Sequence, residues 1–154
     1  MADLELQELP QRLQEGVILV ERGALDQAQM IFAGYLERHP ESSVSLSYAG
    51  LLACMKDRQA SKGLQFCQEA VRRDPGEALC HLNLSKIYFT VGDRYQCVRS
   101  LHRGLKIRSP YRPLLMGFYR TIGLRRKPVL PFLSRNNVLN NLLGRLTWRL
   151  KGLG

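Results

Sequence analysis

The sequence has few of the features that mark membrane, secreted or metal-dependent proteins. Its 154 residues include no run of about 18 to 20 uncharged apolar residues, so no membrane-spanning helix is expected. The acidic residues 1–5 lack the basic segment and apolar run of a secretory signal, which predicts a cytoplasmic location. The hydrophobic fraction of 45% and charged fraction of 23% are those of a soluble globular domain, which argues against a disordered chain or a fibre.

Closely spaced cysteines are also absent. Cys54, Cys67, Cys80 and Cys97 are separated by 13, 13 and 17 residues, whereas a tetrahedral metal site takes ligands two to four residues apart. In a cytoplasmic protein such cysteines behave as small apolar side chains. We therefore expect them to pack in the interior, and we expect no metal and no cofactor.

Negative charge almost disappears from the second half of the chain. Residues 1–77 hold 12 acidic and 8 basic side chains, whereas residues 78–154 hold one acid, Asp93, and 15 bases. The net charges of −4 and +14 add up to the total of +10. Such asymmetry favours an anionic partner. Three classes of partner fit this description: a nucleic acid, an acidic lipid surface and an acidic protein. The alternative is that these basic side chains only keep one face of a helix in contact with water.

Groups that could carry out catalysis do not converge. The three histidines, His39, His81 and His102, fall near unit ends or on predicted helix surfaces, where we expect no acidic residue to orient a general base. Cys80 and His81 are adjacent, but neighbouring side chains on a helix point about 100° apart, a poor geometry for a nucleophile and its base. No glycine-rich phosphate loop follows a predicted strand. We therefore expect that the protein is not an enzyme.

What the sequence does contain is a repeat of 34 or 35 residues. Gly16 aligns with Gly50 and Ser85, and Phe32 aligns with Cys67 and Leu101. Each repeat ends near a proline; these are Pro40, Pro75 and Pro110. A sustained period of this length indicates stacked supersecondary units, each of which buries its apolar face against the next.

Each unit has the pattern of a helical hairpin. Apolar residues recur at helical spacing over residues 11–22 and again over 25–38, with Gly23 between them and Pro40 after them. Small residues recur at aligned positions and predict that the two antiparallel helices of a hairpin approach closely; these are Gly16, Ala28, Ala49, Gly50 and Gly63.

This pattern resembles the tetratricopeptide repeat family. The third unit matches it best, at Leu84, Ser85, Tyr88, Gly92, Asp93, Cys97, Leu101 and Gly104. The second unit is weaker, because Lys56, Asp57 and Arg58 stand where the turn glycine is expected. The resemblance implies an all-α fold, a right-handed α-solenoid of three such hairpins with C-terminal capping helices. The units cover about residues 9–42, 43–77 and 78–111, and a half-unit at 113–124 completes a solenoid over residues 1–124.

The rest of the chain is expected to form a linker and one further helix. Residues 125–135 are basic and contain two prolines, which exclude a continuous helix. Residues 136–152 predict a basic amphipathic helix with one leucine stripe. Trp148 falls opposite that stripe, where it could anchor a partner.

The resemblance implies a protein-interaction scaffold, adaptor or chaperone-type module that holds a peptide or helix against the first helices of its hairpins. The corresponding groove residues are Leu13, Val17, Val20, Tyr48, Leu51, Met55, Leu82, Lys86 and Phe89. Leu13 and Val17 stand where relatives that bind chaperone tails carry polar clamp residues, so such tails are not expected as ligands. The remaining groove is mostly apolar and suits a hydrophobic segment. An alternative is that residues 129–133 or the last helix of this same chain fill it.

A second hypothesis is a peripheral module that binds acidic lipid or nucleic acid through the basic half. The residues assigned to this patch are Arg125, Arg126, Lys127, Arg145, Arg149 and Lys151. A third alternative is self-association through an uncapped end of the repeat stack.

Overall fold

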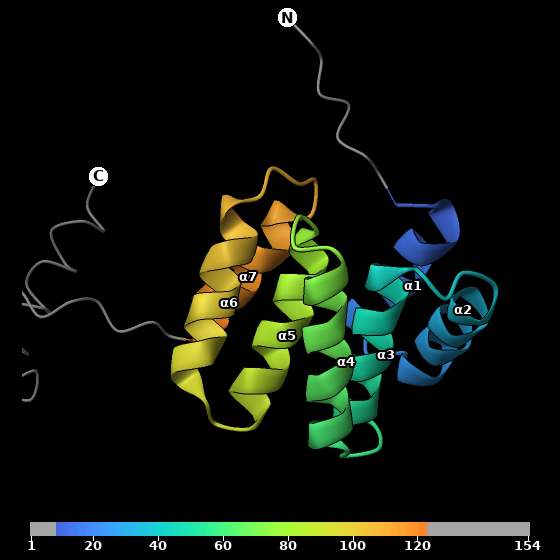
Figure 1. The fold of residues 1–154 in the computed structure, drawn as a ribbon, viewed down its shortest axis with the longest axis horizontal. Helices are drawn as coiled ribbons and strands as arrows, with labels where there is room; N and C mark the ends of the chain where they lie inside the picture. The colour runs from blue at the N-terminus through green and yellow to red at the C-terminus, as the bar shows by residue number, and fades with distance from the viewer. Residues whose placement is uncertain (1–8, 123–154) are drawn as a thin grey trace, which may run out of the picture. The chain divides into compact units, whose positions relative to one another are not determined.

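The computed structural model describes residues 9–122, which form α-helices connected by short loops, with no strand among them (Figure 1). The helices are α1 (Gln11–Glu21), α2 (Leu25–Arg38), α3 (Ser43–Met55), α4 (Ala60–Arg73), α5 (Ala78–Thr90), α6 (Arg94–Lys106) and α7 (Arg112–Thr121). The predicted all-α class is therefore confirmed. The predicted linker at 125–135 and helix at 136–152 lie outside the described residues.

Consecutive helices pack as hairpins. α1 packs on α2, α3 on α4 and α5 on α6, and α7 covers the last hairpin through contacts with α6 and α5. α3 also contacts α5 directly, and the α3–α4 and α5–α6 loops lie at the same edge of the fold, at the bottom of Figure 1. The first helices of the second and third hairpins thus run side by side in the same direction.

The turn inside each hairpin requires a left-handed residue. Gly23 and Gly92 occupy it in the first and third hairpins, with φ of 79° and 83°. In the second hairpin, which lacks this glycine, Arg58 takes a positive φ of 54° instead. A residue with a Cβ is strained in this region, so the second turn reaches a left-handed conformation without glycine at a cost in backbone strain.

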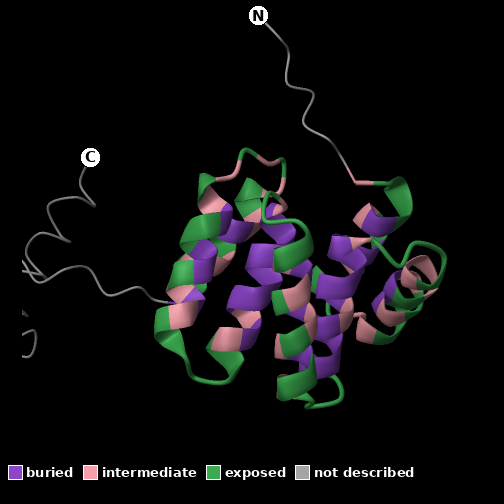
Figure 2. Ribbon diagram, viewed as in Figure 1, coloured by how far each residue is buried: buried purple, intermediate pink, exposed green. Residues whose placement is uncertain are grey.

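Burial divides the helices into two kinds (Figure 2). α3 and α5 are buried around most of their circumference, whereas α4 and α6 bury one narrow stripe each. Phe32 of α2 and Tyr48 of α3 lie at the centre of the junction between the first two hairpins, where their rings stack with centroids 4.3 Å apart. The four cysteines are buried and reduced, as the sequence predicts.

Candidate functional site

Most side chains assigned to the groove belong to the core of this structure. Leu13, Val17, Val20, Tyr48, Leu51 and Leu82 are each at most 5% exposed. They fill the space between the hairpins, because the helices close on each other around the stacked rings of Phe32 and Tyr48. A side chain that is buried in the free chain reaches a partner only if the helices move apart.

The exposed members of the set lie at one edge of the fold. Met55 is the last residue of α3 and is 48% exposed, and Phe89, near the end of α5, is 42% exposed. We call these two residues the apolar edge. The ring of Phe89 meets Phe118 of α7 edge-on at 5.9 Å, and the guanidinium of Arg94 lies 5.8 Å from its centroid. Phe89 is therefore held in place while part of its ring faces solvent.

An ion pair crosses from the third hairpin to the first beside this edge. Lys86 Nζ of α5 lies 2.7 Å from Glu21 Oε1 at the end of α1. The side chain of Lys86 is 19% exposed and that of Glu21 39% exposed, so the contact is only partly screened by water. Lys86, the one charged residue of the predicted set, thus joins two hairpins that are not neighbours in the sequence.

A polar contact between α3 and α5 is not evident from the sequence. Asn83 Nδ2 donates a hydrogen bond to Ser47 Oγ at 3.0 Å, and Ser47 Oγ donates to the carbonyl of Val44 at 2.9 Å. Both side chains are fully buried. Asn83 Oδ1 and the hydroxyl of Tyr48 have no hydrogen-bond partner in the part of the chain that the structure describes. A serine and an asparagine beside the predicted groove positions are the only sequence signal of this contact.

The buried thiols and His81 are poorly suited to nucleophilic chemistry. Burial raises the pKa of the Cys80 thiol to about 12, so this thiol is protonated at neutral pH. Burial lowers the pKa of the adjacent His81, while its Nε2 donates a hydrogen bond to the carbonyl of Pro75 at 3.0 Å. The imidazole therefore contacts the backbone of the preceding loop, and no hydrogen bond connects it to Cys80.

The residues assigned to the basic patch, Arg125, Arg126, Lys127, Arg145, Arg149 and Lys151, lie outside the described residues. The same holds for residues 129–133 and the last helix, so filling of the groove by this chain stays a prediction. Between residues 9 and 122, no three His, Cys, Asp or Glu side chains come together as a metal site would require. No helix in that range has the length and apolar character needed to cross a bilayer.

The fold defines a class: an all-helical protein built from packed helix pairs that repeat along the chain. Comparison with family models finds none that matches this chain, and comparison with curated proteins finds no relative. Among solved structures, the chain is similar to one titled "MamA RS-1 ArsTM double mutant", with 19% sequence identity and a TM-score of 0.45. The match covers 74% of this chain and 57% of that chain, so this chain spans little more than half of that protein's length.

Proposed function

We propose that the chain is a non-enzymatic scaffold that binds a peptide or a helix of another protein beside the ends of its first helices. The observation that carries the proposal is the apolar edge, Met55 and Phe89, exposed where α3 and α5 end next to the Glu21–Lys86 ion pair. Large apolar side chains at the end of stacked helices are the anchors that a hydrophobic segment requires.

The buried groove residues determine how such a partner would bind. Contact with the apolar edge needs no rearrangement, because both side chains already face solvent. Contact with Val17 or Leu51 requires packed helices to move apart, and the ion pair between Glu21 and Lys86 opposes an opening of the stack. We therefore expect binding to begin at Met55 and Phe89, and the deeper residues to take part only in a second step.

The absence of catalysis is part of the same proposal. It is supported by the protonated thiol of Cys80 and by the backbone contact of His81. His39 Nδ1 does lie 3.4 Å from Glu41 Oε1, but both side chains are exposed. A binding module needs none of these groups to be activated. The protein partner, rather than a small molecule, is then the ligand to look for.

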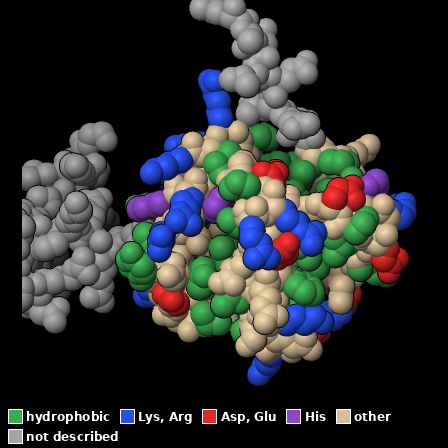
Figure 3. Space-filling model, viewed as in Figure 1, with side chains coloured by type: hydrophobic (Ala, Val, Ile, Leu, Met, Phe, Trp, Pro, Cys, Tyr) green, Lys and Arg blue, Asp and Glu red, His purple; other side chains and the backbone are tan. Residues whose placement is uncertain are grey.

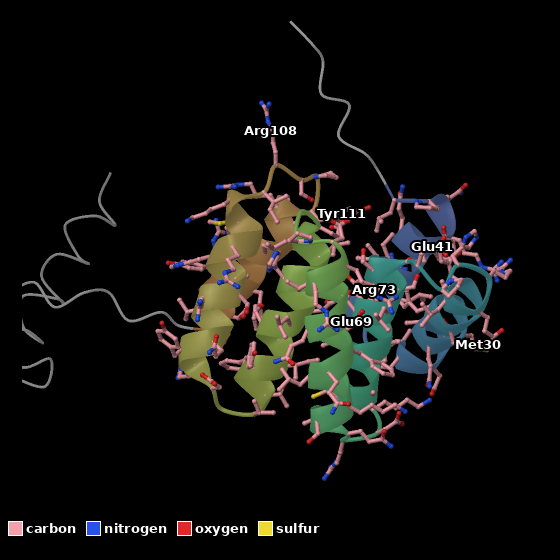
Figure 4. The ribbon with its side chains drawn as sticks, in the orientation of Figure 1. Met30, Glu41, Glu69, Arg73, Arg108 and Tyr111 are labelled. Atoms are coloured by element: carbon pink, nitrogen blue, oxygen red, sulfur yellow. The ribbon has the colours of Figure 1, made fainter. Side chains whose placement is uncertain are left out.

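The test is a selection of peptide ligands from a displayed random library, followed by affinity measurements on two variants. Met55→Glu places a charge in the apolar edge and is expected to weaken the selected peptides about tenfold or more, which corresponds to about 1.4 kcal/mol. Met30→Glu is the matched control, because Met30 is also exposed, at 70%, but lies on α2 (Figure 4). Equal loss in both variants, or no selected peptide at all, would contradict the proposal.

A further inference from the structure

The outer face of α6 presents a row of basic and aromatic side chains. α6 turns Cys97, Ser100, Leu101 and Gly104 toward the core. The exposed residues of the opposite face recur every three or four positions and so form one stripe along the helix. We call this stripe the α6 ridge; its members are Tyr95, Arg99, His102, Arg103 and Lys106. It extends about 16 Å along the helix axis at 1.5 Å per residue.

The positive charge of the ridge is not neutralised within the described part of the chain. Lys56, Arg72, Arg73 and Lys86 of the second and third units each pair with a carboxylate, and the pair of Glu69 with Arg73 is visible on α4 in Figure 4. Arg99, Arg103 and Lys106 make no such pair with any described residue, and no acidic residue follows Asp93 in the sequence. Lys, Arg and His side chains accordingly gather over α6 and the loop that follows it (Figure 3).

The charge continues beyond the end of α6. Arg108 projects from the α6–α7 loop away from the body of the fold (Figure 4), and Arg112 is exposed at the start of α7. Arg112 Nη1 donates to the carbonyl of Leu105 at 2.6 Å, a contact that fixes the guanidinium without cancelling its charge. An extended anionic chain that follows α6 would therefore meet cations along the helix and at its end.

Aromatic rings lie among these cations. Tyr95 is 72% exposed. No other large apolar or aromatic side chain in the described part of the chain is more exposed. The ring of His102 stacks on Tyr119 of α7, with centroids 5.7 Å apart and planes inclined by 28°. Exposed rings beside arginines are the arrangement that binds unpaired bases while the cations contact phosphates.

From the combination of these features, we propose that the α6 ridge binds single-stranded nucleic acid without sequence preference. Arg99, Arg103 and Lys106 contact phosphates, and Tyr95 supplies a surface for base stacking. A lipid surface fits less well, because the exposed aliphatic side chains of the described residues lie elsewhere, on α1, α2, α3 and the α5–α6 turn. The ridge is separate from the apolar edge, so this proposal does not depend on the proposed function.

Fluorescence anisotropy with a labelled oligonucleotide of about 20 nucleotides and mixed sequence tests the proposal on the full chain. The ridge variant R99Q/R103Q/K106Q removes three charges from α6. The control variant R12Q/R22Q/R38Q removes three exposed charges from the first hairpin. Between about 50 and 200 mM salt, log K falls as log salt rises, and the ridge variant is expected to make this slope less negative by about two, or about 0.7 for each lost phosphate contact. The control is expected to leave the slope unchanged.

The variant Tyr95→Ala separates stacking from charge. It is expected to weaken oligonucleotide binding about fivefold or more while it leaves the salt slope unchanged. Polyglutamate of matched length is expected to bind far more weakly than the oligonucleotide, because it offers charge without bases.

Three results would overturn the proposal. The first is an equal effect of the ridge and control triple variants, which would mean attraction by net charge alone. The second is polyglutamate binding as tight as that of the oligonucleotide, together with no effect of Tyr95→Ala. The third is loss of binding to vesicles of acidic phospholipid in the ridge variant, with its oligonucleotide binding intact. Circular dichroism melts of all variants check that each is folded.

Discussion

At the scale of single residues, two glycines determine how closely α3 and α4 approach. A Cβ atom on Gly50 would lie 2.7 Å from the carbonyl oxygen of Gly63, and one on Gly63 would lie 2.5 Å from that of Gly50. Both neighbours are backbone atoms, which cannot rotate away as a side chain does. The sequence-based prediction that small residues allow the helices of a hairpin to approach closely is confirmed at this pair.

Gly63→Ala is therefore expected to destabilise the fold by about 1 to 3 kcal/mol, because the two helices must separate to admit the methyl group. Gly34→Ala is the matched control: Gly34 also lies inside a helix, and a Cβ there meets nothing within 4 Å. That substitution is expected to stabilise by about 0.5 to 1 kcal/mol, since alanine loses less backbone entropy in a helix. Denaturant unfolding measures both, and a shift of the same sign in both variants would contradict the packing argument.

At the scale of the helices, a side chain caps the N-terminus of α3, of α5 and of α6. Ser42, Glu77 and Asp93 each accept a hydrogen bond from a backbone N–H in the first turn of the helix that follows. α1, α2, α4 and α7 have no side-chain cap. For α6 the cap also places one carboxylate at the start of an otherwise basic helix, where the helix dipole favours negative charge.

The cap of α6 gives a prediction in which hydrogen bonding and charge can be separated. Asp93 Oδ1 accepts from the N–H of Gln96 at 3.0 Å. Asp93→Ala removes this acceptor and is expected to cost about 1 kcal/mol, whereas Asp93→Asn keeps an acceptor and should cost much less. Thermal unfolding monitored by circular dichroism gives both values. If asparagine destabilises as much as alanine, the charge rather than the hydrogen bond is what matters at this position.

The boundaries of the helices could be predicted from the sequence because they depend on local chemistry. The apolar spacing predicts helices at 11–22, 25–38 and 113–124, and the structure has them at Gln11–Glu21, Leu25–Arg38 and Arg112–Thr121. Turn glycines, small residues and prolines act within a few positions of themselves, so their effect can be read from neighbouring letters.

The candidate site could be predicted only in part, because it depends on contacts between distant residues. Spacing gives the helix face on which Tyr48 lies, but not that its ring stacks on Phe32 of the preceding hairpin. Nor does it give the closure of the hairpins that buries Val17 and Leu51. The α6 ridge could not be predicted for a different reason. Basic residues recur throughout the second half of the sequence, and only the fold shows which of them lack an acidic partner.

At the scale of the whole molecule, the first and third hairpins are joined by the pair of Glu21 and Lys86, 65 positions apart in the sequence. The two side chains come from hairpins separated by an entire unit, so their contact depends on how strongly the stack of hairpins curves. Because Lys86 is mostly buried along its stem, its charged end reaches Glu21 only in a narrow range of arrangements. The ion pair is thus a probe of the global arrangement rather than of any one helix.

Reversing the charges of this pair tests the arrangement. Lys86→Glu places two carboxylates together and is expected to destabilise the fold, as is Glu21→Lys, which places two ammonium groups together. The double variant E21K/K86E restores the attraction, and a double-mutant cycle should give a favourable coupling of about 0.5 to 1 kcal/mol. The coupling should shrink at high salt, because the pair is partly exposed. Simple additivity of the two substitutions would mean that this ion pair contributes nothing measurable to the stability of the stack. The pair would then not oppose the opening of the stack that contact with Val17 and Leu51 requires.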